Sequence, residues 1–223
     1  LQAAHAWDSQ SLCGHPGQSG ARAITTEVPY DTTAVVYERG GVTVTSFPVL
    51  HIQDGAVGYR LDYAGRSVVF SGDTRPCRTL VEAAQGVDLL IHETFPPVDV
   101  YAVKAGIPPA FAEVIVNGVH TSPSMAGVVF ARSGARMSVM WHLAVDHETV
   151  GAAMRDVRTR YDGPVTIAQD LTVFTLTPEA VITRQAKVDP SAWPVLGPTE
   201  VSGPPMSAPQ PPPAWWADRL LTD

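Results

Sequence analysis

Cysteine is scarce in this chain: only Cys13 and Cys77 occur among 223 residues. Two cysteines specify neither a disulfide framework nor a thiolate zinc cluster, so we expect a cytoplasmic location. Long apolar runs are also lacking. No stretch approaches the roughly 18 consecutive apolar residues of a membrane span, and no signal peptide is recognisable. We therefore expect no membrane partner.

Basic charge is the second scarcity. The chain has 15 Lys and Arg residues against 22 Asp and Glu residues, a net charge of -7, and its basic residues are scattered along the sequence. A nucleic-acid surface usually shows a clustered basic footprint. This composition therefore disfavours nucleic acid as a partner and favours a small-molecule substrate. It is compatible with a homodimer.

What is present divides the chain into three parts. Residues 1–33 are polar and irregular, and residues 34–185 carry alternating apolar patterns. Residues 186–223 are rich in proline, including the run Pro211-Pro212-Pro213. Proline-rich sequence favours extended, mobile conformations, so we predict a disordered tail after one ordered domain.

The ordered part alternates strand and helix signals. Runs rich in β-branched and apolar residues predict strands, and longer amphipathic or capped segments predict helices. The predicted strands are 34–38, 42–47, 57–63, 67–70, 87–91, 137–141, 165–168 and 171–176; the predicted helices are 79–85, 122–134 and 147–161. Residues 98–116 read as helical pieces interrupted by prolines. This pattern predicts an α/β layered fold.

Polar side chains follow several of the apolar strands. In layered α/β folds, ligands bind at strand ends, where loops leave the sheet. The residues so placed are His51, Asp73, His92, Glu93 and His142, with His120 just before the cap of the helix at 122.

Each of these residues alone has an ordinary explanation, such as helix capping by Asp73 or a hydrogen bond from a single histidine. Together, several imidazoles and a carboxylate form a ligand set that zinc, manganese and iron all accept. Gly72 would let the backbone turn so that Asp73 faces the site.

An ordered series of motifs resembles the metallo-β-lactamase-fold hydrolases, and within them the ribonuclease Z-like and arylsulfatase-like branch. The series covers roughly residues 42–176 and consists of His51, Gly58-Tyr59-Arg60, Ser71-Gly72-Asp73-Thr74, Ile91-His92-Glu93-Thr94, His120-Thr121-Ser122 and Trp141-His142-Leu143. The sequence of residues 54–60 and 74–76 also resembles that of guanitoxin-biosynthesis hydrolases of this fold.

The resemblance implies an αββα sandwich, of which this chain would contain mainly the C-terminal half. It implies two divalent metal ions, zinc first and manganese or iron as alternatives, which would activate a hydroxide for attack on an ester. His51 and His142 would each ligate one ion, and Asp73 would bridge both.

The resemblance assigns a catalytic role to three further residues. His92, Glu93 and His120 match positions that form a proton relay beside the leaving group. They would deliver a proton to the departing oxygen.

One motif of the resembled family is missing. The metal-binding pattern His-x-His-x-Asp-His should precede His51, but only His5 and His15 do so, outside any such pattern. Because the chain also begins with Leu1, we expect a fragment of a longer hydrolase that binds zinc weakly and exposes an apolar sheet face.

Two functions stay open at this stage. The first is a hydrolase of a small ester, lactone, sulfate or phosphodiester. The alternative is a non-catalytic module that binds a partner through the exposed sheet or the proline-rich tail. Retention of Asp73, His142 and the His92-Glu93 pair favours the hydrolase.

Overall fold

The computed structural model describes residues 26–186, 216 and 219–221. Its strands are β1 (Ala34–Arg39), β2 (Val42–Pro48), β3 (Val57–Tyr63), β4 (Arg66–Phe70), β5 (Leu89–Glu93), β6 (Met137–Trp141), β7 (Val165–Ile167), β8 (Thr172–Leu176) and β9 (Val181–Gln185). Its helices are α2 (Arg78–Ala83), α3 (Val98–Ala105), α4 (Pro109–Gly118), α5 (Pro123–Ser133) and α6 (His147–Val157). The predicted α/β class is confirmed.

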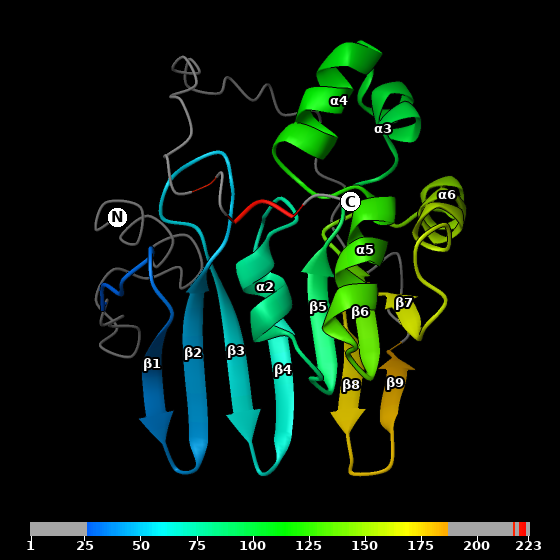
Figure 1. The fold of residues 1–223 in the computed structure, drawn as a ribbon. Coiled ribbons are helices and arrows are strands. Elements are labelled where there is room, and N and C mark those ends of the chain that lie inside the picture. The colour runs from blue at the N-terminus through cyan, green and yellow to red at the C-terminus, as the bar shows by residue number, and fades with distance from the viewer. Residues whose placement is uncertain (1–25, 187–215, 217–218, 222–223) are drawn as a thin grey trace, which may run out of the picture.

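A seven-stranded sheet in the order β1-β2-β3-β4-β5-β6-β7 forms the centre of the molecule (Figure 1). Strands β1 to β4 are antiparallel neighbours, whereas β4 to β7 run parallel. The predicted first hairpin turns at Gly40 and Gly41, whose φ angles of 60° and 80° suit a glycine turn. The parallel strands bring their carboxyl ends to one edge of the sheet.

One face of the sheet is sealed by helices. In Figure 1, α2 and α5 lie in front of the strands, and the core beneath them includes the fully buried side chains of Phe47, Val69, Leu90 and Met140. Because side chains alternate along a strand, the residues next to these in sequence face the other way.

The other face carries exposed aromatic side chains. In the part of the chain that the structure describes, no helix packs on this face over β1 to β4. Tyr59 pairs with Phe70 across β3 and β4, and these side chains are 40% and 42% exposed. Tyr37 and Tyr63 are also exposed. We call these four residues the aromatic face. They match the expected exposed apolar side of the sheet.

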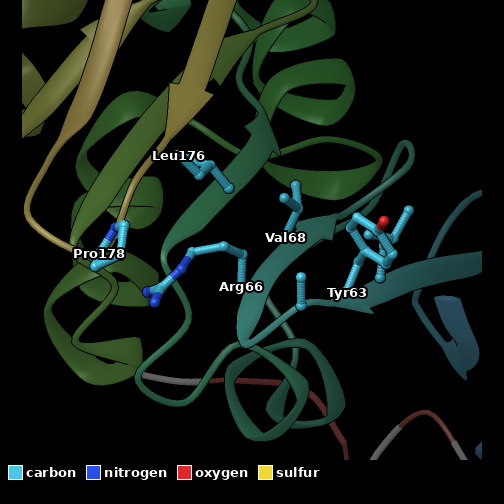
Figure 2. Close-up of a pocket in the computed structure, with 7 residues that line it drawn as sticks. Tyr63, Arg66, Val68, Leu176 and Pro178 are labelled. Carbon is cyan, nitrogen blue, oxygen red and sulfur yellow. The ribbon is translucent and has the colours of Figure 1, made fainter. Parts of the chain in front are cut away.

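A small hairpin of β8 and β9 forms a separate two-stranded sheet. β9 was not predicted. Leu176 and Pro178 from this hairpin meet Tyr63, Arg66 and Val68 around a cavity of about 420 Å³ (Figure 2). This cavity lies by the first residues of β4, away from the strand ends that carry the predicted site, and its walls are mainly apolar.

Two proline-interrupted helices, α3 and α4, occupy the segment that the sequence left ambiguous. The stretch Pro109–Ser133 is apolar and long enough, by length and composition, to cross a membrane. It is divided into α4 and α5 by residues 119–122, and seven residues of α5 are buried in the protein. Burial identifies α5 as a core helix of this fold.

The predicted segments at the two ends of the chain, 1–33 and 186–223, lie partly outside the described residues. Residues 1–25 and the proline-rich run 187–215 lie outside the described residues, whereas residues 26–33 form no helix or strand. Near the C-terminus, Trp216 and Leu221 are buried in the core cluster. Leu221 donates its N–H to the carbonyl of Pro76 at 3.0 Å, so these few residues pack against the body of the protein.

A buried carboxylate ties three strands together at the opposite end from the predicted site. Asp88, just before β5, accepts hydrogen bonds from Arg136 before β6 and from the Ser67 N–H of β4 at 2.9 Å. Arg66 adds an ion pair at 3.3 Å. Burial opposes ionisation, but these donors outweigh it and hold the pKa of Asp88 below its ordinary value of 3.8.

Replacing Asp88 with Asn should lower the free energy of unfolding by about 1 to 3 kcal/mol at pH 7, because a hydrogen-bonded buried charge is lost. Two half-buried arginines would also lose their partner. Urea unfolding measures the change. The matched control is Asp162→Asn at an exposed aspartate, which should change stability by less than about 0.5 kcal/mol.

The free energies of unfolding of the parent and of Asp88→Asn should become more similar in acid. Because the folded pKa of Asp88 is depressed, its contribution is fully present above the unfolded pKa and is lost as pH falls through the folded pKa. The stability gap between the parent and Asp88→Asn should therefore narrow below about pH 4. A gap that stayed constant down to about pH 2 would contradict this ionic role.

Candidate metal centre

The carboxyl ends of β4, β5 and β6 place the predicted site residues at one edge of the sheet. Phe70 lies opposite Ile91, and Glu93 lies opposite Trp141, so the loops after these strands start side by side. Gly72 has a φ of 62°, and a Cβ there would lie 3.0 Å from the carbonyl oxygen of Val57. Glycine therefore permits the turn that presents Asp73, as predicted.

Asp73, His120 and His142 converge at this edge. One potential ligand atom from each lies within 4.8 Å of the others. The Nε2 atom of His142 is 3.6 Å from Oδ2 of Asp73. His142 adopts a left-handed backbone with φ of 67°, which is rare for a residue with a side chain. The structure thus brings together two predicted metal ligands and one predicted catalytic histidine.

A buried carboxylate orients one of these rings. Oε1 of Glu93 lies 3.0 Å from Nδ1 of His120 and accepts the backbone N–H of Thr74 at 3.0 Å. Burial raises the pKa of Glu93, although His120 and the Thr74 N–H oppose that shift. Since Nδ1 of His120 faces Glu93, its Nε2 is the nitrogen left for a substrate or an ion.

His51 borders the group without joining it. Its ring centroid is 5.1 Å from that of His120, and its Nδ1 lies 3.3 Å from the carbonyl oxygen of Val119. Burial lowers the pKa of His51, and the contact with the Val119 carbonyl only partly offsets that effect. A neutral imidazole is the form that binds metal. The predicted ligand role of His51 stays a prediction.

His92 is the one predicted site residue that the structure separates from the others. Its side chain is fully buried on the helix-covered face of β5 and meets Phe130 edge-on at 6.0 Å. Burial lowers the pKa of His92 to about 4, so its ring is neutral at pH 7. The prediction placed His92 after the strand, but β5 continues to Glu93. Neighbours in a strand face opposite sides, so this geometry gives His92 no catalytic position.

Sequence reasoning missed the aromatic support of the site. Phe95 stacks on His120 with ring centroids 3.9 Å apart and planes 11° from parallel. Tyr101 in turn packs against Phe95. Phe95 comes two residues after Glu93, and that proximity was the only available signal. The stack fixes the ring plane that Glu93 has already oriented.

The donors fit a divalent transition metal ion. Imidazole nitrogens and a carboxylate are ligands that zinc, manganese and iron accept. Ligand atoms around a tetrahedral zinc ion lie about 3.4 Å apart at bond lengths of about 2.1 Å. The Asp73–His142 separation of 3.6 Å is already close to that value, whereas the widest separations in the group would need to contract.

Comparison with known proteins gives relatives for about half of the chain. No protein-family model matches it. Ribonuclease Z of Myxococcus xanthus is 38% identical over 108 residues, which are 48% of this chain and 31% of that protein. Ribonuclease Z of Mycobacterium avium is 36% identical over 117 residues, covering 52% of this chain and 40% of the relative. The chain thus spans well under half the length of these relatives.

Two further proteins are similar to parts of this chain. A zinc phosphodiesterase ELAC protein 2 homolog of Caenorhabditis elegans is 30% identical over 132 residues, covering 53% of this chain and 14% of that protein. Among solved structures, the metallo-β-lactamase fold protein YhfI of Bacillus subtilis superposes with a TM-score of 0.48 at 20% identity, covering 64% of this chain and 50% of the other. That superposition is too loose to carry an argument.

The sequence relatives bear on the resemblance predicted from the motifs. They are ribonuclease Z proteins and a zinc phosphodiesterase by name, and the chain presents its Asp73, Glu93, His120 and His142 together at one sheet edge. Over the part that they match, the chain is similar in sequence to these ribonuclease Z proteins and to the zinc phosphodiesterase.

Proposed function

We propose that the protein is a metal-dependent hydrolase of phosphodiesters or closely related small esters. The observation that carries the proposal is the convergence of Asp73, His120 and His142 at the carboxyl edge of the parallel strands, with Glu93 buried behind His120. Metal-assisted hydrolysis requires side chains that hold a metal ion, and an oriented imidazole beside them can transfer the proton.

The names of the relatives narrow the bond that is cut. A ribonuclease and a zinc phosphodiesterase both act on phosphodiesters, which favours that bond over a lactone or a sulfate. The net charge of -7 and the scattered basic residues disfavoured nucleic acid, whereas the relatives are ribonucleases by name. The proposed substrate is therefore a phosphodiester, and RNA is one candidate for it.

The residues that would hold metal in this proposal are His51, Asp73 and His142, and Asp73 would be shared if two ions are bound. A bound divalent ion would act as a Lewis acid and lower the pKa of water. The contribution of the chain is to present imidazoles and a carboxylate from three separate loops. Burial keeps His51 neutral, which favours ligation.

The proton donor in this proposal is His120. Glu93 holds its Nδ1 at 3.0 Å, so the opposite nitrogen can give a proton to the leaving oxygen. Phe95 stacks on the ring and limits its rotation. The buried carboxylate also stabilises the ring when it carries a proton.

The alternative function, partner binding without catalysis, has one observation in its favour. The aromatic face, Tyr37, Tyr59, Tyr63 and Phe70, is exposed on the helix-free side of the sheet. A non-catalytic module would have no need to hold Asp73 and His142 together, so metal binding separates the two functions.

Replacing Asp73 with Asn, or His142 with Ala, should remove most of the zinc that the chain binds. Each change deletes a charged or imidazole ligand from a site with few others. Zinc per chain after dialysis against a limiting chelator, measured by elemental analysis, gives the result. We expect weak, substoichiometric binding in the parent chain.

The matched control is His147→Ala, which removes an exposed imidazole outside the group. Its zinc content should equal that of the parent. Full zinc content in Asp73→Asn would contradict the ligand assignment. Loss of zinc in His120→Ala would make His120 a ligand instead of the proton donor.

Replacing Glu93 with Gln in the active protein should slow hydrolysis according to the leaving group. From a diester of 4-nitrophenol, 4-nitrophenolate departs without needing a proton, so kcat for this substrate should change only a few-fold. A diester of phenol needs protonation, so its kcat should fall by about 100-fold or more. Parallel assays of the two substrates measure the difference.

Zinc content must be unchanged in this variant, because Glu93 acts through His120. Glu179→Gln, at an exposed glutamate, is the matched control and should slow neither substrate. An equal loss with both leaving groups would rule out proton donation by this pair.

A further inference from the structure

A pocket of about 360 Å³ opens beside His120, on the side of the loop that follows Asp73. It has polar and apolar walls. Its lining includes Arg75, His120, Ser122, Ser124, Leu220 and Leu221. None of the relatives' names, nor the motif series, assigns a role to this pocket apart from His120.

Arg75 is the unusual member of the lining. Its backbone N–H donates to the carbonyl of Leu50 at 2.6 Å, which fixes its position two residues after Asp73. Among the described residues its guanidinium has no ion pair or hydrogen bond, and its Nε atom is buried without a partner. A half-buried cation without an ionic partner is unfavourable, so the guanidinium is available to an anion.

The charges around Arg75 leave room for an anion. A second arginine, Arg160, lines the same pocket. The one lining carboxylate, Glu113, is exposed and accepts a hydrogen bond from Asn117 at 2.8 Å. A further carboxylate, Asp156, accepts the N–H of Ser124 at 3.0 Å. Both acids already have partners, whereas Arg75 has none among the residues that the structure describes.

Neutral donors complete the polar wall. The hydroxyls of Ser122 and Ser124 lie 3.5 Å apart at the start of α5. Ser122 is the N-cap of α5, but its hydroxyl does not bond to the helix N–H groups. Hydroxyls that are not used in capping can donate to an oxyanion. A tetrahedral oxyanion is well matched by an arginine fork and such donors.

The apolar wall joins residues from the middle of the sequence to residues near its C-terminus. Pro76 and Met125 meet Leu220 and Leu221, which the chain holds there through the Leu221–Pro76 hydrogen bond of 3.0 Å and the bridge between Leu220 and Cys77. Figure 1 shows residues 219–221, in red, beside the loop that leads into α2. A ligand with an organic body next to its charge would contact both walls.

We propose that this pocket binds the phosphate group of an organic phosphate, with Arg75 as the charged contact and Leu220 and Leu221 against the organic part. In the proposed hydrolase, this group would be a phosphate next to the scissile bond, because His120 lines the same pocket. That placement rests on the proposed function, whereas phosphate binding itself does not.

The test uses phenyl phosphate and the full chain, with metal removed by a chelator. Titration calorimetry should show binding of phenyl phosphate and none of phenol, which lacks the charge. Arg75→Gln should weaken binding at least about tenfold, since one charge-assisted contact contributes about 1.5 to 3 kcal/mol. Arg75→Lys, which keeps the charge and loses the fork, should fall between the two.

Two controls keep the result specific. Arg39→Gln removes an exposed arginine on β1 and should leave the affinity within about twofold of the parent. Asp73→Asn should retain phenyl phosphate binding while losing zinc. The zinc experiment can therefore fail without affecting the phosphate experiment, and the reverse also holds.

Three outcomes would overturn the proposal. These are equal affinity in Arg75→Gln and the parent, equal binding of phenol and phenyl phosphate, and binding that requires zinc. Thermal unfolding of each variant identifies any loss of fold. If Arg75→Gln does not fold, Arg75→Lys carries the test, and parent-like affinity together with binding of phenol would overturn the proposal.

Discussion

The carboxylate of Glu93 is the contact on which the site depends. It is fully buried, and it joins the end of β5 to the loop after β4 through the Thr74 N–H and to the segment that follows α4 through His120. Three segments that are distant in sequence are thereby fixed relative to one another. Its second oxygen has no hydrogen-bond partner among the described residues. A buried carboxylate with a raised pKa and an imidazole beside it is typical of a functional position.

The sheet supplies the rigid frame for this contact. Its helix-covered face holds the core, with Phe47, Val69 and Leu90 fully buried, while the aromatic face stays exposed. The site lies at the edge where these two faces meet. Its residues therefore rest on a packed core on one side and remain open to a ligand on the other.

Much of this arrangement could be predicted from residue patterns, because strand ends and glycine turns have local signals. Gly40 and Gly41 indicated the first hairpin, and Gly72 indicated the turn before Asp73. The C-terminal end of β5 could not be placed from the sequence. The apolar run ends at Ile91, whereas the strand continues through the polar residues His92 and Glu93. A change of one residue in register decides which of His92 and Glu93 lies on the helix-covered face.

Other features depended on contacts that no local pattern contains. The stacking of Phe95 on His120 joins the loop after β5 to the residue after α4. That the Arg75 guanidinium has no partner among the described residues becomes visible only when the acids of those residues are placed. The packing of Trp216 and Leu221 against the core was also hidden, because a proline-rich composition says nothing of where its last residues bind.

The left-handed backbone of His142 has an evolutionary consequence. A side-chain-bearing residue in that conformation costs on the order of 1 kcal/mol, and asparagine or glycine would occupy it more easily. Selection for a stable fold alone would tend to replace this imidazole. A histidine at φ of 67° is therefore held in a conformation that costs stability, and the packing around it has to offset that cost.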